Sequence, residues 1–367
     1  MRILFVHPRL GVLGGAERVL VHMLGALRDN DLSLISDDWC PQRVNTIFDI
    51  EPPEIEWIRC ASFRPLLPHF QAFHWLYYAR KIDSLIQKMD RDCDLLIETQ
   101  QVYSDPGRVG RLVSYIHYPS LAAPPPEKEK SIASSIYYAI LRSIVLRRVG
   151  KISLALTNSP FTARKVVEYL KIRPLVVPPP VDVRRFYSDR SWSDREDKVV
   201  SIGTFLPFKR HHLLLQVARK LPEIRFVIMG TLREDHRSYY EKLCKQKSEN
   251  VTIMQDVALD AAAKELASAK VYVHLCPEHF GISVVEAAAA GCVPIVYEVG
   301  GPAECLGDAA IIWKDLDHLR SCIIESVTDG YFWSKMSDKA RNAAFEFDAS
   351  IFEQRIKNIV EGQLWKK

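Results

Sequence analysis

Two glutamates, Glu278 and Glu286, stand eight positions apart in a segment whose residue types suit a bound diphosphate. The run at 270–275 before them has the pattern of a buried strand, and the run at 284–290 strongly favours a helix. The first N–H groups of that helix, near Gly281, have no intrahelical partner and attract an anion, which glycine allows to approach closely. An offset of eight residues is at most about 12 Å of helical rise. One carboxylate therefore suits a sugar and the other a ribose.

The segment EHFGISVVE at 278–286 resembles the E-x7-E signature of the retaining glycosyltransferases of family 4, which have the two-domain GT-B fold. Four further patches carry the likeness: HPRLGVLGGAERVL at 7–20, SYIHYP at 114–119, LTNSPFTARKV at 156–166 and VVPPPVDV at 176–183. Together they are most similar to the GDP-mannose-dependent alpha-1,2-mannosyltransferases that extend lipid-linked oligosaccharide in N-glycosylation. The resemblance touches both halves of the chain, and its five ordered patches are more specific than E-x7-E alone.

The resemblance implies roles for residues of the second half of the chain. Glu278 would contact the sugar ring, Glu286 the ribose of the nucleotide, and Gly230, at the end of a predicted strand, would lie near the base. The start of the helix would hold the donor diphosphate. Its residues are Phe280, Gly281, Ile282 and Ser283.

A cationic loop follows the first predicted strand of the second half. The resemblance matches Lys209 to the lysine that holds the diphosphate, where a fixed positive charge stabilises the leaving group. The family usually has an arginine earlier in this loop, at positions that here hold Thr204 and Leu206. Arg210 either replaces that arginine or faces solvent, and the sequence favours neither.

Two sites in the first half follow predicted strands, and ligands of open parallel sheets bind at such strand ends. Gly14 and Gly15 open a helix after the first strand. A glycine pair is more often only a turn, but the resemblance places Gly15 against the donor diphosphate across a cleft. His117 ends the strand at 112–117. From the residues alone it is more often a structural histidine, whereas the resemblance brings it to the transferred sugar.

The order of elements predicts an α/β protein with two Rossmann-like, doubly wound parallel sheets. The 367 residues exceed what one core usually supports. Prolines 178–180 block a helix, so we expect a first, acceptor-binding domain at 1–180 and a nucleotide-sugar domain at 181–348. A C-terminal helix at 349–367 is expected to pack back on the first domain. The strands are predicted at 2–7, 32–36, 55–59, 94–98, 112–117 and 152–157, then at 198–202, 225–229, 251–254, 271–275, 294–297 and 310–313.

Composition excludes several classes of protein. The net charge of +4 falls short of a nucleic-acid-binding domain. The eight cysteines form no C-x2-C pair, which predicts reduced thiols and neither a zinc site nor a redox motif. D-x-D triplets at 29–31 and 90–92 flank predicted helices and are interpreted as turns, so no metal cofactor is expected. We also expect no signal peptide and no membrane-spanning helix.

The predicted function is transfer of a hexose, mannose from GDP-mannose, to a lipid-linked saccharide at the cytosolic membrane face. Aromatic and basic residues gather at 63–81 and 128–151, where they form either a membrane-binding face or ordinary packed helices. Two alternatives stay open. One is a UDP-sugar-dependent transferase acting on another acceptor, and the other is a non-catalytic protein that binds sugar nucleotides on the same scaffold.

Overall fold

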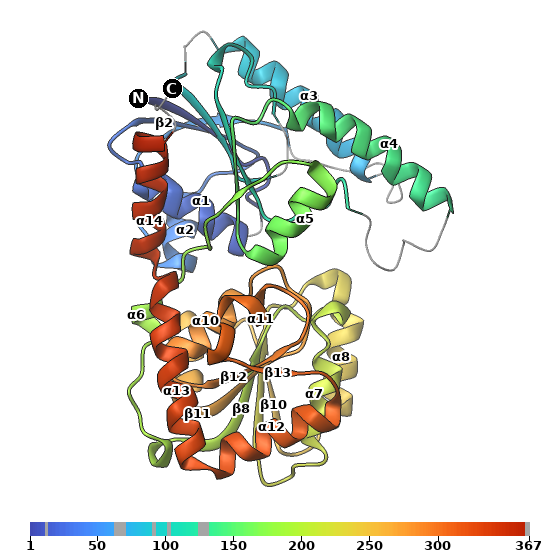
Figure 1. Ribbon diagram of the computed structural model, residues 1–367, viewed down its shortest axis with the longest axis vertical. Helices are drawn as coiled ribbons and strands as arrows, with labels where there is room; N and C mark the ends of the chain where they lie inside the picture. Colours follow the sequence, from blue (N-terminus) through green and yellow to red (C-terminus); the bar gives the residue numbers. More distant parts are fainter. Residues whose placement is uncertain (12–13, 62–70, 90–92, 101–103, 124–131, 364–367) are drawn as a thin grey trace. The chain divides into compact units, whose positions relative to one another are not determined.

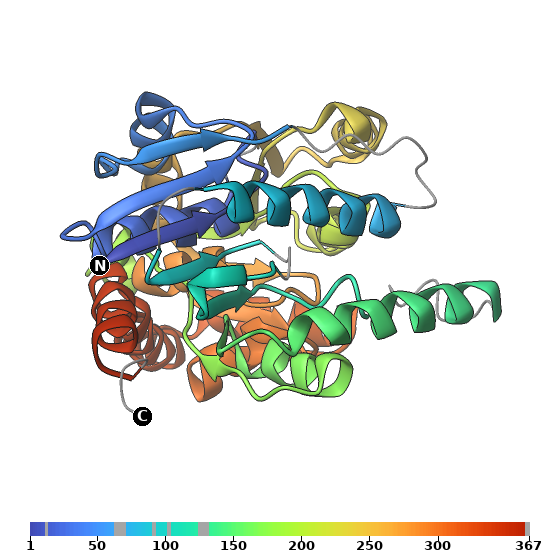
Figure 2. The same cartoon turned by 90° about the horizontal axis from the view of Figure 1, so that it is seen from above.

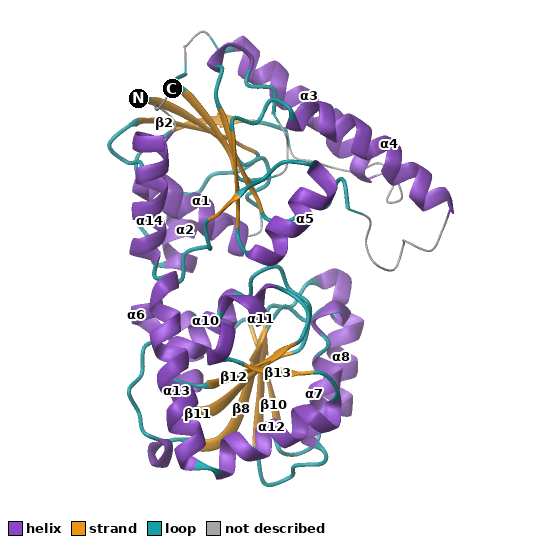
Figure 3. Cartoon of the chain, viewed as in Figure 1, coloured by secondary structure: helices purple, strands orange, loops and turns teal. Residues whose placement is uncertain are grey.

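The computed structural model describes residues 1–11, 14–61, 71–89, 93–100, 104–123 and 132–363. The chain separates into two compact units, one of residues 1–180 with 352–367 and one of residues 181–351. Each unit is a parallel β-sheet with helices on both faces (Figures 1 and 3). The two units are described in turn.

The first unit contains a seven-stranded sheet in the order β3-β2-β1-β4-β5-β6-β7, with every pair parallel. Its strands are β1 (Arg2–Val6), β2 (Asp31–Ser36), β3 (Glu56–Arg59), β4 (Leu95–Glu98), β5 (Leu112–Ile116), β6 (Leu154–Thr157) and β7 (Leu175–Val176). Its helices are α1 (Gly15–Ala26), α2 (Pro41–Phe48), α3 (Gln71–Lys88), α4 (Ile132–Val149) and α5 (Pro160–Leu170).

Alternation along the central strand β1 fills both faces of this sheet. Phe5 packs with α1 on one face, and Leu4 packs with α3 on the other, as side chains of a strand point alternately to opposite sides. Helix α14 (Ala349–Asn358) lies near the end of the chain, and its Phe352 and Ile356 join the core on the α1 face. The end of the chain therefore completes the core of the first unit. Figure 2 shows the same elements from above.

The second unit contains a six-stranded parallel sheet in the order β10-β9-β8-β11-β12-β13. Its strands are β8 (Glu196–Ile202), β9 (Arg225–Gly230), β10 (Val251–Gln255), β11 (Ala269–His274), β12 (Val293–Tyr297) and β13 (Ile311–Trp313). Its helices are α6 (Val183–Phe186), α7 (His211–Ala218), α8 (Arg237–Gln246), α9 (Leu259–Ala267), α10 (Ile282–Ala289), α11 (Gly301–Cys305), α12 (Leu316–Thr328) and α13 (Gly330–Ala344).

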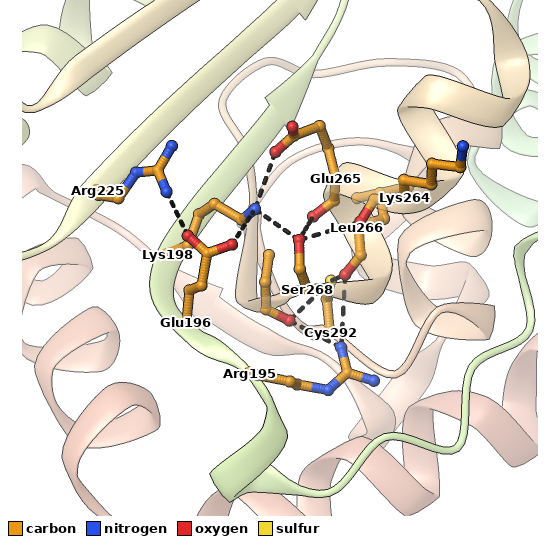
Figure 4. A network of polar contacts seen from close by, with 10 residues as sticks. Arg195, Glu196, Lys198, Arg225, Lys264, Glu265, Leu266, Ser268 and Cys292 are labelled. Atoms are coloured by element: carbon orange, nitrogen blue, oxygen red, sulfur yellow. Dashed lines mark hydrogen bonds and ion pairs between the residues drawn. The ribbon is translucent and has the colours of Figure 1, made fainter.

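Two buried cations anchor the amino end of β8 (Figure 4). The Arg195 guanidinium donates to the carbonyls of Ala269 and Ala290 at 2.8 and 2.7 Å. Lys198 Nζ lies 2.9 Å from a carboxylate oxygen of Glu265. Ala290 follows the last turn of α10, where carbonyls without intrahelical partners favour a positive charge. These contacts hold helices at the amino ends of the strands, and the site described below lies at the carboxyl ends.

Candidate functional site

The loop from β11 to α10 carries Glu278 on a tightly fixed backbone. Gly281 precedes α10 with φ at +89°, a left-handed conformation that favours glycine, and a Cβ there would lie 2.8 Å from Pro302 Cγ. The Glu278 carbonyl accepts a hydrogen bond from the Gly301 N–H at 2.7 Å. A Cβ on Gly301 would lie 2.0 Å from the His279 carbonyl oxygen. The loop therefore packs directly on the backbone of the β12–α11 connection.

The Glu278 carboxylate lies between a lysine and a histidine. One oxygen forms an ion pair with Lys209 Nζ, and the other lies 3.4 Å from His274 Nε2. Burial first, and then the Lys209 charge, lower the pKa of His274 to about 3. This imidazole is neutral near pH 7, so of these two neighbours it is Lys209 that balances the charge of the carboxylate. Burial also lowers the pKa of Lys209, whereas the adjacent carboxylate favours its charged form.

The cationic loop is shaped by glycines of two neighbouring strands. A Cβ on Gly230, the last residue of β9, would lie 2.0 Å from the Gly203 carbonyl oxygen, so the two loops touch through backbone atoms. The Lys209 side chain covers Gly203, where a Cβ would lie 3.2 Å from Lys209 Cδ. The Thr204 carbonyl accepts a turn hydrogen bond from the Leu206 N–H at 2.7 Å. Close packing alone therefore requires glycine at position 230, whether or not the base of a nucleotide binds near it.

Arg210 ends this loop in a left-handed conformation, with φ at +57°. Its guanidinium carbon lies 4.9 Å from the centre of the Tyr297 ring at the end of β12, within the range of a cation–π contact. Arg210 therefore contacts the carboxyl end of the sheet and does not only face solvent.

The start of α10 joins the end of β11 through side chains. The Tyr272 hydroxyl donates to Ser283 Oγ at 2.8 Å. Glu286 follows Ser283 by three residues, which places both on one face of α10. Burial raises the pKa of Tyr272, and the charge of Glu286 adds to that effect. Glu286 is 7% exposed, as expected for a carboxylate set among Val284, Val285 and alanines.

In the first unit the glycine pair is tied to the ends of two strands by Glu17. One carboxylate oxygen of Glu17 accepts a hydrogen bond from the Gly14 N–H at 2.8 Å, and the other lies 3.2 Å from His7 Nε2. His7 Nδ1 lies 2.7 Å from Thr99 Oγ1, beyond the end of β4. The His7 contact lowers the pKa of Glu17 against the opposing effect of burial. Glu17 thus holds the turn before Gly15 against the carboxyl ends of β1 and β4.

His117 follows β5, as predicted, and is half-buried. Its ring centre lies 4.9 Å from that of Tyr115, and its carbonyl accepts a hydrogen bond from Asn158 Nδ2 at 3.0 Å. Both partners belong to the same unit. These contacts fix the backbone at the end of β5.

Comparisons with known proteins show what the chain is similar to. Residues 184–342 match the family model described as Glycosyl transferases group 1. Among relatives, the GDP-Man:Man(3)GlcNAc(2)-PP-Dol alpha-1,2-mannosyltransferases of Candida glabrata and Dictyostelium discoideum are 29% and 26% identical, each over 66% of this chain. These matches cover 55% and 57% of the relatives, so the chain spans little more than half of their length.

Solved structures place the whole chain in the GT-B fold. Anabaena Alr3699/HepE in complex with UDP and glucose matches with a TM-score of 0.74 and 17% identity, over 98% of this chain and 99% of that chain. WaaG, a glycosyltransferase involved in lipopolysaccharide biosynthesis, matches with a TM-score of 0.69 and 15% identity, over 98% of this chain and all of that one. The predicted fold class is confirmed.

The second unit brings together some of the residues predicted from the sequence. Lys209 and Glu278 are in contact, and the loops that carry Gly230 and Thr204 adjoin them through Gly203. Three residues escaped the prediction. His274 and Cys276 lie inside an apolar run that indicates only a buried strand, and Gly301 belongs to a distant connection. A G-G pair at 300–301, two residues beyond the predicted strand at 294–297, was the available signal for the last of these.

Proposed function

We propose that this protein is a retaining hexosyltransferase that moves mannose from GDP-mannose to a lipid-linked saccharide. The observation that carries the proposal is the Lys209–Glu278 ion pair, set beside the start of α10 within the glycosyltransferase domain. The choice of mannose, of GDP and of a lipid-linked acceptor rests on the names of the relatives. The cluster alone supports the broader statement that a nucleotide-linked sugar binds here.

Lys209 and the first N–H groups of α10 would stabilise the leaving diphosphate. Lys209, whose side chain packs on Gly203, and the helix N-terminus at Gly281 would both offer positive potential to a diphosphate without moving during the reaction. Phe280, Ile282 and Ser283 complete this segment. The acceptor would attack from the side of the leaving group, as the resemblance to retaining GT-B enzymes implies, while the sugar develops positive charge.

The two carboxylates have different surroundings that suit different tasks. The Glu278 side chain is 20% exposed and paired with Lys209, so an arriving sugar hydroxyl can reach it. Glu286 is more deeply buried on the Ser283 face of α10. We assign Glu278 to the transferred sugar and Glu286 to the ribose. In the first unit we assign His117 to the transferred sugar and the Gly14–Gly15 turn to the donor diphosphate.

A membrane surface is the proposed location of the acceptor, on the cytosolic side. Helix α4 exposes Ile136 at 57% and Ile140 at 48%, and Arg147 is exposed further along the helix. Two basic residues of the predicted membrane segment instead make contacts inside the unit. Arg142 donates to the Tyr169 carbonyl, and Arg148 pairs with Asp83. Of the predicted segments, residues 63–70 and 128–131 lie outside the described part. Within that part, the structure contains no helix with the length and apolarity needed to span a bilayer.

A donor panel tests the proposal. GDP, UDP, GDP-mannose and UDP-glucose are compared by thermal shift, where a ligand at 100 times its Kd stabilises by about 2.7 kcal/mol. We expect the guanine pair to shift the unfolding temperature most, and UDP-glucose to do so if the alternative donor is correct. Transfer from radiolabelled donor to a lipid-linked acceptor then separates an enzyme from a binding protein.

The Glu278→Gln variant tests the role of this carboxylate, because the substitution removes its charge and changes its volume little. We expect it to retain nucleotide diphosphate binding and to lose transfer by at least 100-fold. Asp256→Asn, in the loop after β10, is a matched carboxylate control that should keep both. Normal turnover in Glu278→Gln would exclude the assigned role. We also propose that transfer needs no divalent ion, so EDTA should not reduce it.

A further inference from the structure

Three different side chains converge at the carboxyl end of β11. His274 ends the strand, Cys276 follows in the loop, and Glu278 comes two residues later. Their ligand atoms all lie within 4.8 Å of one another. His274 Nε2 is 3.6 Å from Cys276 Sγ and 3.4 Å from Glu278 Oε2.

The two separations from His274 Nε2 match a tetrahedral zinc ion. Bonds of about 2.3 Å to sulfur and about 2.0 Å to nitrogen and oxygen place the sulfur about 3.5 Å from the nitrogen, and the nitrogen about 3.3 Å from the oxygen. The ligand set also selects the ion, because imidazole and thiolate suit zinc and disfavour magnesium and calcium. Cysteine spacing alone could not reveal this set, since the three ligands are of three types.

The surroundings hold two of the ligands and leave access to the third. His274 and Cys276 are 2% and 1% exposed, and the His274 carbonyl accepts a hydrogen bond from Trp313 Nε1 at 2.9 Å. The half-buried Glu278 provides the open side. One of its carboxylate oxygens faces His274 while the other faces Lys209. An ion can therefore bind without rearrangement of the strand.

We propose that His274, Cys276 and Glu278 bind one zinc ion, and that the ion inhibits the protein by occupying the Glu278 carboxylate. On binding, the Cys276 thiol releases its proton to solvent, a zinc–sulfur bond forms, and nothing is oxidised or reduced. Zinc here is an inhibitor and not a cofactor. The inhibition rests on the proposed function, whereas ion binding stands by itself.

Cobalt provides the binding test, because it replaces zinc and its absorption reports tetrahedral geometry and thiolate ligation. The full chain, treated with EDTA and dialysed, is titrated with Co²⁺ and then with Zn²⁺. We expect one Co²⁺ per chain with a thiolate-to-metal band, displaced by zinc. Cys276→Ser should weaken Co²⁺ binding at least tenfold, and Cys322→Ser, another buried cysteine of this unit, should not. Absence of the band in the wild type, or its persistence in Cys276→Ser, would overturn the site.

Two further measurements keep the proposal testable if Cys276→Ser folds poorly. X-ray absorption of the zinc-loaded wild type should show one sulfur neighbour at about 2.3 Å, and only nitrogen and oxygen neighbours would refute the site. Transfer by the wild type should fall with micromolar zinc and recover with EDTA, while Cys276→Ser should resist zinc. Equal zinc sensitivity of both proteins would refute the inhibition. If no donor is used by any variant, the proposed function fails, and the cobalt titration still decides the ion site.

Discussion

We predict that His211 makes the stability of the second unit depend on pH. This residue begins α7 and is 1% exposed. Its Nε2 lies 3.1 Å from the Gly203 carbonyl oxygen, and its Nδ1 has no hydrogen-bond partner among the described residues. Burial and the charge of Lys209 lower the pKa of His211, the hydrogen bond to Gly203 opposes them, and the resulting pKa is about 4. His212 and His274 are the other titratable groups near this ring.

The sign follows from the unfolded chain, where histidine has a pKa of about 6.5. Because the folded pKa is depressed, the stabilisation is fully present above pH 6.5 and is lost as the pH falls toward 4. Linkage gives a loss of about 2 kcal/mol at pH 5 relative to pH 7.5 from this one side chain. Such a loss is a large part of the 5–15 kcal/mol that typically separates folded from unfolded domains.

The assay compares wild type with His211→Gln, whose amide can still donate to the Gly203 carbonyl but does not titrate. Urea unfolding in the presence of EDTA is measured at pH 7.5 and at pH 5. Other titrating groups are common to both proteins, so their contributions cancel in the difference. We expect the wild type to lose about 2 kcal/mol more than the variant over this range. Equal losses would show that His211 is not held neutral by the fold.

Three further predictions concern function. Lys209→Met should lower kcat/KM for the donor by at least tenfold. Arg210→Ala should also lower it if Arg210, which lies over the Tyr297 ring, has replaced the missing arginine. An unchanged kcat/KM in Arg210→Ala would mean that another cation has that role. Glu17→Gln should lower kcat more than it raises the donor KM, and it should shift the acid limb of the pH–rate profile. The reason is that the carboxylate charge that holds the Gly14 turn and His7 is lost. An unchanged pH–rate profile would show that Glu17 only caps the helix. Ile136→Glu with Ile140→Glu should reduce flotation on anionic liposomes at low salt, and equal flotation would leave α4 without a membrane role.

Most strands were predictable because they are short apolar runs bounded by loop residues, whereas the two-residue strand β7 (Leu175–Val176) was missed. The predicted strand at 225–229 is observed as Arg225–Gly230, and that at 294–297 as Val293–Tyr297. Helix α2 was missed, because only Val44 and Phe48 of its eight residues are buried and half of its residues are polar. A helix so short draws its stability from the core it touches, which its own sequence does not show.

The candidate site was predictable only in part, and the reason is the distance along the chain between its components. Glu278 and Lys209 carry charge at strand ends, a signal that the sequence displays directly. The shape of the Glu278 loop instead depends on Gly300 and Gly301, where a Cβ would lie 2.6 Å from the Glu278 carbonyl oxygen and 2.0 Å from that of His279. Any side chain at these two positions must push the loop away from the sheet. The position of the carboxylate is thus set by residues more than twenty positions later, which themselves have no group that could bind a sugar.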